Sequence, residues 1–210
     1  MQHRFDHGLR RRIVANLDRF ERRPIVDTAM RKAAVALVVV PGEIAGDAAV
    51  LLTKRPETLR RHGGQFALPG GRLDDGETDA EAALRELQEE LGLSLDQSAI
   101  LGQLDDFPTR SGFRITPIVA WADDISLLKP DPTEVAKVFR IPLSDLESSQ
   151  IPFLETSTAS DHPVMSAPLA TIGHRVYAPT AALLYQFREV ALRGADTRVA
   201  HFDQPKFAWK

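Results

Sequence analysis

Three glutamates near residue 90 are spaced so that together they could hold a divalent metal ion. Glu86, Glu89 and Glu90 fall on one side of a helix, because successive residues turn by about 100°. Carboxylates about 6 Å apart repel by roughly 2–3 kcal/mol per pair, and an i,i+4 ion pair returns only about 0.3–0.5 kcal/mol. The alternative, a solvated acidic helix face, leaves this repulsion in place. Oxygen ligands without nearby sulfur or imidazole favour Mg²⁺ or Mn²⁺ over Zn²⁺.

The flanking residues predict the helix that would carry these glutamates. Thr78 and Glu81 form a capping box, so the helix should begin at about Asp79, and Gly92 should end it. An apolar stripe runs along it, and the glutamates should lie well away from that stripe. The stripe consists of Ala80, Leu84, Leu87 and Leu91.

Residues 71–93, GRLDDGETDAEAALRELQEELGL, meet every specified position of the pattern G-x5-E-x7-R-E-U-x-E-E-x-G-U, where U is aliphatic. The stretch therefore resembles the Nudix box, and nine fixed positions in one segment make the resemblance specific. The matching residues are Gly71, Glu77, Arg85, Glu86, Leu87, Glu89, Glu90, Gly92 and Leu93.

The resemblance implies that water attacks a phosphoanhydride with the help of a bound divalent metal ion. It implies Glu86, Glu89 and Glu90 as metal ligands, joined by the Gly71 carbonyl. Glu77 is expected to pair with Arg85 and so to orient the cluster. Two residues, Glu89 and Glu134, are candidates for the general base.

A basic segment, KRPETLRRHGGQFALPGG (54–71), precedes the box. With the strand before it, this segment resembles the signature of Nudix coenzyme A pyrophosphatases, L-L-T-x-R-[S/A]-x3-R-x3-G-x3-F-P-G-G. The chain departs from that signature at Pro56 and Leu68. Guanidinium groups suit a ligand with several phosphates, because their forked donors bind phosphate oxygens bidentately. The alternative is a solvated basic loop. The substrate-binding residues expected here are Arg55, Arg60, Gly64 and Gly70.

The box itself does not identify the substrate. The signature favours coenzyme A or a thioester of it, split to 3′,5′-ADP and (acyl-)4′-phosphopantetheine. Another Nudix diphosphate substrate, such as ADP-ribose, NADH or a dinucleotide, is the first alternative. A ligand-sensing Nudix domain without catalytic activity is the second, although the intact box glutamates argue against it.

The bulk composition limits the possible partners. The chain has 210 residues, a formal charge of −3 and no cysteine, so nothing global attracts nucleic acid and no disulfide can form. No apolar run reaches the 18 residues of a membrane span. We expect a cytoplasmic enzyme with a small-molecule substrate, no nucleic acid or membrane partner, and a sequence compatible with a homodimer.

The remaining patterns predict the architecture. Leu9, Ile13, Leu17 and Phe20 indicate an amphipathic helix that ends before Pro24, and 33–40 with 47–53 indicate a β-hairpin. A strand is expected within 109–122, another opening at Glu134, an irregular flap over 147–170, and a strand and helix over 174–194. The family resemblance implies an α/β/α sandwich with a mixed sheet. We divide the chain into a helix and linker (1–31), a Nudix domain (32–194) and a tail (195–210).

Overall fold

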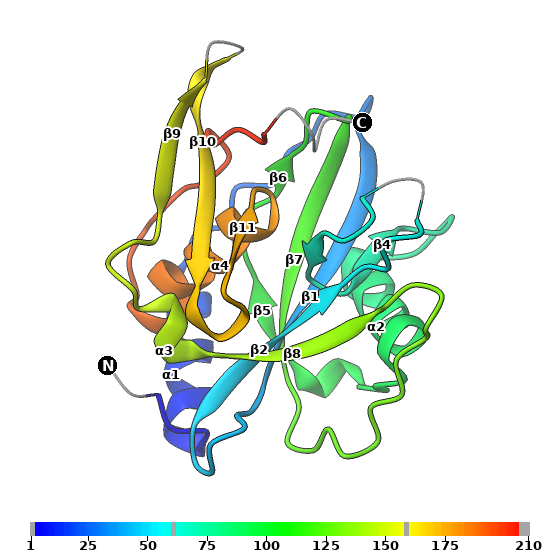
Figure 1. Ribbon diagram of the computed structural model, residues 1–210, viewed down its shortest axis with the longest axis vertical. Helices are drawn as coiled ribbons and strands as arrows, with labels where there is room; N and C mark the ends of the chain where they lie inside the picture. The colour runs from blue at the N-terminus through cyan, green and yellow to red at the C-terminus, as the bar shows by residue number, and fades with distance from the viewer. Residues whose placement is uncertain (1–2, 60–61, 158–159, 206–210) are drawn as a thin grey trace.

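The computed structural model describes residues 3–59, 62–157 and 160–205 (Figure 1). Its central sheet has the strand order β3-β2-β1-β7-β5, with β4 added to β1, β6 to β7 and β8 to β2. β1 and β7 run parallel and the other pairs are antiparallel, so the sheet is mixed as predicted. The strands are β1 (Arg31–Pro41), β2 (Ala48–Lys54), β3 (Phe66–Ala67), β4 (Gly70–Arg72), β5 (Ile100–Gln103), β6 (Phe107–Pro108), β7 (Phe113–Trp121) and β8 (Lys137–Pro142).

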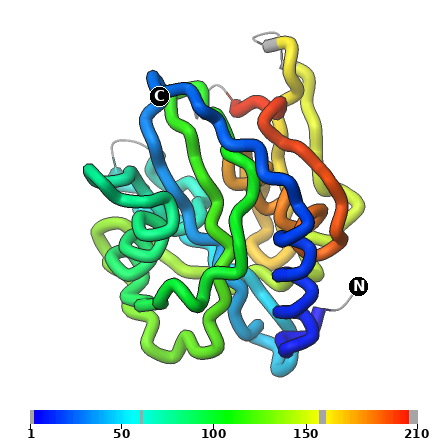
Figure 2. The backbone as a smooth tube through the Cα atoms, turned by 180° about the vertical axis from the view of Figure 1, so that it is seen from behind, coloured from blue at the N-terminus to red at the C-terminus, as the bar shows by residue number. Residues whose placement is uncertain are grey.

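Successive side chains of β1 point to opposite faces of the sheet, and each set belongs to a separate hydrophobic core. Ala34 and Ala36 face the box helix α2 (Asp79–Leu91), whereas Leu37 and Val39 face the opposite core. That second core also contains side chains of α1 (His7–Arg19) and α4 (Thr180–Phe187), which continues into the π-helical turn η3 (Arg188–Leu192). The two views place α1 and α2 on opposite sides of the molecule (Figure 1 and Figure 2). The predicted three-layer sandwich is confirmed.

The N-terminal helix forms for the reasons that its sequence suggests. The Asp6 side chain accepts a hydrogen bond from the Leu9 amide at 2.8 Å and caps the first turn. Leu9, Ile13 and Leu17 are buried in the core shared with α4 and η3. The apolar face of α1 therefore packs into the core between the central sheet and α4.

Residues 147–170 differ from the irregular flap that the sequence predicts. They contain β9 (Phe153–Ser157) and β10 (Ser160–Leu169), which join β11 (His174–Tyr177) in a separate antiparallel sheet. β9 and β10 form a long ribbon that projects from the body in Figure 1. Three short elements complete the chain: the helix α3 (Leu143–Leu146) lies between β8 and β9, the 3₁₀ turn η2 (Ala170–Ile172) lies between β10 and β11, and the 3₁₀ turn η1 (Gln97–Ala99) precedes β5.

The segment after η3 packs along the body as far as it is described. Val199 is fully buried, and Asp203 accepts hydrogen bonds from the Arg110 guanidinium. Among the described residues, no helix is long and apolar enough to cross a membrane.

Candidate active site

The box helix begins and ends where the sequence predicts. The Thr78 side chain accepts from the Glu81 amide while the Glu81 side chain accepts from the Thr78 amide, which is the predicted capping box. Gly92 ends the helix in the left-handed conformation with a φ of 66°. These two ends fix the rotation of α2 and hence the directions of its glutamates.

The three glutamates are exposed to very different degrees. Glu89 is exposed and Glu86 is half-buried, but Glu90 is buried, with only 4% of its surface exposed, beside Leu87 and Leu91. The prediction that all three lie well away from the apolar stripe is therefore wrong for Glu90. β4 and the loop before β8 cover this side of the helix: the amide of Asp131 donates to the Glu90 carbonyl at 2.9 Å, and that of Lys129 to the Leu91 carbonyl at 2.8 Å.

Arg85 is the centre of the polar network on α2. Its Nε and Nη2 donate to the two carboxylate oxygens of Glu77 at 2.9 and 3.1 Å, so the predicted Glu77–Arg85 contact is present and bidentate. Nη1 donates to both Glu86 and Glu89, at 3.0 and 2.9 Å. Nη2 also donates to the Arg72 carbonyl at 2.9 Å, which ties the helix to β4. The Arg85 hydrogen bond is the main reason why the pKa of Glu77 lies below its ordinary value.

In the metal-free protein, burial is the main influence on the pKa values of Glu86 and Glu90. The pKa of Glu90 is raised to about 8: burial is the largest cause, Glu86 and Glu134 also raise it, and Arg55 and the Gly70 amide oppose the shift. Burial also raises the pKa of Glu86, against the effect of Arg85. The local environment therefore disfavours two neighbouring negative charges unless a cation compensates them.

The glycine pair of β4 lies between α2 and the sheet. A Cβ added to Gly71 would lie 2.2 Å from Glu86 Oε1, so only glycine leaves room for that carboxylate. A Cβ on Gly70 would lie 2.3 Å from the Ala34 carbonyl oxygen, and its φ of +155° also requires glycine. The two glycines therefore allow close packing against Glu86 on one side and against β1 on the other.

Glu134 does not open a strand. It lies in an exposed turn after Asp131, and β8 begins at Lys137. The Asp131 side chain forms this turn, since it accepts hydrogen bonds from the Thr133 amide and hydroxyl. Glu134 still lies close enough for its charge to raise the pKa of both Glu86 and Glu90.

Among its described residues, the basic segment places the Arg55 guanidinium beside the box carboxylates. Arg55 Nη1 lies 3.9 Å from Glu90 Oε1. Gly64 holds this arginine in place through the backbone: its amide donates to the Arg55 carbonyl, and the Arg55 amide donates to the Gln65 carbonyl. Arg60 lies outside the described residues. Gly64 has a φ of +71°, and its missing side chain leaves space for the Glu57 carboxylate.

A cleft of about 430 Å³ opens beside the glycine pair. Gly70, Gly71 and Arg55 lie at one end, where the carboxylates are. Its other lining residues come from strands, from the loops beside them, from the start of α4 and from the C-terminal segment, and sequence reasoning did not assign them. They include Phe66, Arg72, Thr109, Ser111, Phe113 and Leu183. Phe113 and Ile115 alternate along β7, a pattern that places both on one face of the sheet.

The residues at this end of the cleft suit a divalent metal ion by donor chemistry and by shape. The donors are carboxylate oxygens, and the missing side chain of Gly71 lets the Glu86 carboxylate lie directly against β4. Within the described ranges no three of these side chains converge on one point, because Arg85 Nη1 holds Glu86 and Glu89 while Glu90 lies nearer Arg55.

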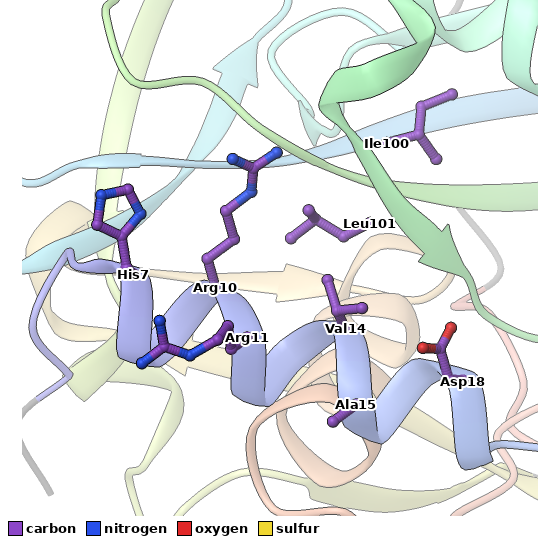
Figure 3. A pocket seen from close by; sticks show the side chains of 8 residues that line it. All are labelled: His7, Arg10, Arg11, Val14, Ala15, Asp18, Ile100 and Leu101. Carbon is purple, nitrogen blue, oxygen red and sulfur yellow. The ribbon is translucent and has the colours of Figure 1, made fainter.

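A second hollow, of about 630 Å³, lies between α1 and β5 (Figure 3). The side chains of Arg10 and Val14 rise from the helix toward Leu101. None of its lining residues is shared with the cleft, and the box residues are all elsewhere.

Comparison with known proteins gives a consistent family. A model described as NUDIX domain matches residues 30–163. The chain is 34% identical over 154 residues to an uncharacterized Nudix hydrolase NudL of Photorhabdus laumondii, covering 72% of this chain and 73% of that protein. It is 39% identical over 109 residues to a NudL protein of Yersinia enterocolitica, covering 51% of this chain and 56% of the relative; this match spans little more than half of that relative's length.

A solved structure supports the fold. The MutT/nudix family protein from Enterococcus faecalis superposes with a TM-score of 0.53 at 18% identity, covering 77% of this chain and 62% of that chain. At this identity the likeness concerns the fold alone.

Proposed function

This chain belongs to the NUDIX domain family, and we propose that it is a metal-dependent hydrolase that splits the phosphoanhydride of coenzyme A or of a coenzyme A thioester. The products would be 3′,5′-ADP and (acyl-)4′-phosphopantetheine. Hydrolysis of a nucleoside diphosphate derivative is what the family suggests in general. The identity of the derivative rests on the basic segment before the box.

The carboxylates near the glycine pair support the metal-dependent part of the proposal. Members of this family generally use divalent metal ions such as Mg²⁺ or Mn²⁺. Glu86, Glu89, Glu90 and the Gly71 carbonyl would hold the metal, which when bound neutralises phosphate oxygens and lowers the pKa of a coordinated water. Glu77 would act through Arg85, since the bidentate contact fixes the guanidinium that holds both Glu86 and Glu89.

The reaction requires one water and one base. The water oxygen bonds to a phosphorus atom, the bridging phosphorus–oxygen bond breaks, and the base removes a proton from the water. Glu89 and Glu134 are both exposed beside the cluster, and we propose these two as candidates for the base. The pH dependence of kcat for Glu89→Gln and Glu134→Gln separates them, because only the base variant should lose the acidic limb of the profile.

The observation that carries the proposal is the position of Arg55. This signature arginine stands 3.9 Å from Glu90, at the carboxylate end of a cleft large enough for part of a nucleotide. A guanidinium there would bind the diphosphate that the metal also contacts. Gly64 and Gly70 would support binding by shaping the backbone around Arg55 and β4, and Arg60 is proposed as a further phosphate ligand on the signature alone.

The test is a turnover assay with Mg²⁺ or Mn²⁺ on coenzyme A, ADP-ribose and NADH, with identification of products. Release of 3′,5′-ADP from coenzyme A at a kcat/KM well above that for the other two supports the proposal. A higher kcat/KM for ADP-ribose or NADH would mean that this compound, and not coenzyme A, is the substrate. Binding without turnover of any of them would indicate a ligand-sensing domain. A cytoplasmic location and a homodimer remain predictions that this assay does not address.

A further inference from the structure

The aromatic ring of Phe113 has two arginines over it at the end of the cleft away from Arg55. The Arg31 guanidinium carbon lies 3.9 Å from the ring centroid, and that of Arg72 lies 5.2 Å from it. In the part of the chain that the structure describes, neither guanidinium forms an ion pair with a carboxylate. Arg31 uses one donor on the Ser111 carbonyl at 2.6 Å. Two concentrated positive charges therefore remain without an anionic partner.

The strand register places all three side chains on the cleft face of the sheet. Ala33 and Val35 line the cleft, and Arg31 precedes them on the same side of β1. Phe113 is paired with Arg31 across the β1–β7 ladder, and Arg72 is paired with Ala33 across the β1–β4 ladder. Phe113 and Arg72 themselves line the cleft, together with the hydroxyl-bearing Thr109 and Ser111.

The same register gives the distance from the carboxylate end. Gly71 is paired with Ala34, three residues along β1 from Arg31, which corresponds to about 10 Å at 3.3 Å per residue. The Arg72 carbonyl also accepts from Arg85, so the pair is connected to the box helix by a single hydrogen bond. Cations thus lie on both sides of the glycine pair: Arg55 beside Glu90, and the stacked pair of Arg72, next to Gly71 in β4, and Arg31, about 10 Å along β1.

We propose that Arg31 and Arg72, held over Phe113, bind a second phosphate of the substrate, namely a phosphomonoester on the ribose of an adenine nucleotide. In coenzyme A this group is the 3′-phosphate; this identification rests on the proposed function. Sequence reasoning assigned phosphate recognition to Arg55 and Arg60, but the position of Arg55 beside Glu90 suits the diphosphate instead.

Stacking on Phe113 orients the two guanidiniums so that they can bind an anion. A guanidinium lying over a ring keeps its N–H donors at its edge, available for bidentate contact with phosphate oxygens. A phosphomonoester carries between one and two negative charges at neutral pH and accepts several hydrogen bonds. Two arginines on one ring can therefore distinguish a nucleotide that carries the extra phosphate from one that lacks it.

The direct test is calorimetric binding of 3′,5′-ADP and 5′-AMP to the full chain in EDTA, which needs neither metal nor turnover. The wild type should prefer 3′,5′-ADP, and Arg72→Ala or Arg31→Ala should reduce that preference by roughly 10–150-fold, the range for loss of a charge-assisted hydrogen bond. Lys32→Ala is the matched control: it removes a positive charge from the next residue of β1, on the other side of the strand, and should leave the preference unchanged. Equal wild-type affinity for the two nucleotides, or an unchanged preference in both arginine variants, would overturn the proposal.

A kinetic test separates this inference from the proposed function. The ratio of kcat/KM for coenzyme A over dephospho-coenzyme A should fall in Arg72→Ala and stay at the wild-type value in Lys32→Ala. The pair NADPH and NADH tests a 2′-phosphate in the same way, and a preference confined to that pair would overturn the assignment to a 3′-phosphate. If the wild type hydrolyses no coenzyme A species, the proposed function fails, and the nucleotide-binding ratio alone then decides for or against the arginine site.

Discussion

Glu90 is a carboxylate in an environment that disfavours its charge. Its pKa of about 8 in the metal-free protein exceeds the ordinary value of 4.5, because burial is the largest effect and Glu86 and Glu134 add to it, while Arg55 opposes them. The folded protein therefore binds this proton more tightly than the unfolded chain does. Without metal, the stability that the proton provides should be lost as the pH rises from about 4.5 to about 8.

We predict that Glu90→Gln flattens this pH dependence. Glutamine has no charge to bury, so in EDTA the variant should melt at a higher temperature than the wild type at pH 8 and at a similar temperature at pH 4.5. Added Mg²⁺ should stabilise the wild type more than the variant at pH 8. Thermal melts from pH 4.5 to 9 measure both effects. A wild-type curve that does not fall over this range would contradict the assigned pKa.

Turnover should rank Glu77 and Glu90 differently. Glu90→Gln removes a proposed metal ligand and should lower kcat by several factors of ten, at 1.36 kcal/mol for each factor. Glu77→Gln should cost only about 10–100-fold, because Glu77 acts through Arg85. Steady-state kinetics of both variants at saturating metal give the comparison. An equal loss in the two would place Glu77 among the metal ligands themselves.

The burial of Glu90 shows what the spacing of the glutamates could not convey. Thr78, Glu81 and Gly92 predict the helix correctly, because capping is a local interaction. The contact of Glu77 with Arg85 also follows from a short sequence distance. Glu90 is buried by β4 and by the loop around Asp131, which are brought against it only by the sheet topology. No helical projection contains that information.

At the scale of the element, the two glycines of β4 would respond differently to an added side chain. A methyl group on Gly71 would meet the movable end of the Glu86 side chain, whereas a methyl group on Gly70 would meet the backbone of β1. We predict that Gly71→Ala folds with nearly wild-type stability but loses more than about tenfold in kcat, because the methyl group displaces the carboxylate of Glu86, a proposed metal ligand.

Gly70→Ala is the comparison for that variant. It should be destabilised by roughly 1–3 kcal/mol, since both its φ and the Ala34 carbonyl exclude a side chain. Urea unfolding and kinetics on the two proteins distinguish the cases. Comparable stability losses in both would mean that the Glu86 carboxylate cannot move away from residue 71.

The sheet of β9, β10 and β11 could not be predicted from the local sequence pattern. β1 and β2 were predictable because apolar residues fill them almost continuously. β10 contains Pro163, Pro168 and two serines, so its sequence is typical of a loop. It becomes a strand through pairing with β11 from Ser166↔Tyr177 to Leu169↔His174, a partner that no local signal identifies.

At the scale of the whole molecule, a buried carboxylate joins the N-terminal segment to the box helix. Asp106 is 1% exposed and accepts hydrogen bonds from Arg22 Nη2 at 2.5 Å, the Ile25 amide at 2.8 Å and Thr116 Oγ1 at 2.7 Å. Arg114 Nε lies 3.7 Å from it, and the same arginine donates to Asp79 at the first turn of α2. The segment between α1 and β1 is therefore held to the sheet by side chains rather than by strand pairing.

We predict that Asp106→Asn destabilises the protein by about 3 kcal/mol, because an amide cannot compensate the two guanidiniums or accept all three hydrogen bonds in a site closed to water. For a chain of this size such a loss corresponds to a fall of roughly 6–12 °C in Tm. Asp18→Asn is the charge-matched control: Asp18 is exposed on α1, so its replacement should change stability by less than about 0.5 kcal/mol. Calorimetry on both variants measures the difference. Equal Tm values for Asp106→Asn and Asp18→Asn would show that α1 and its linker are held by their apolar contacts alone, since the network around Asp106 would then contribute nothing beyond a surface charge.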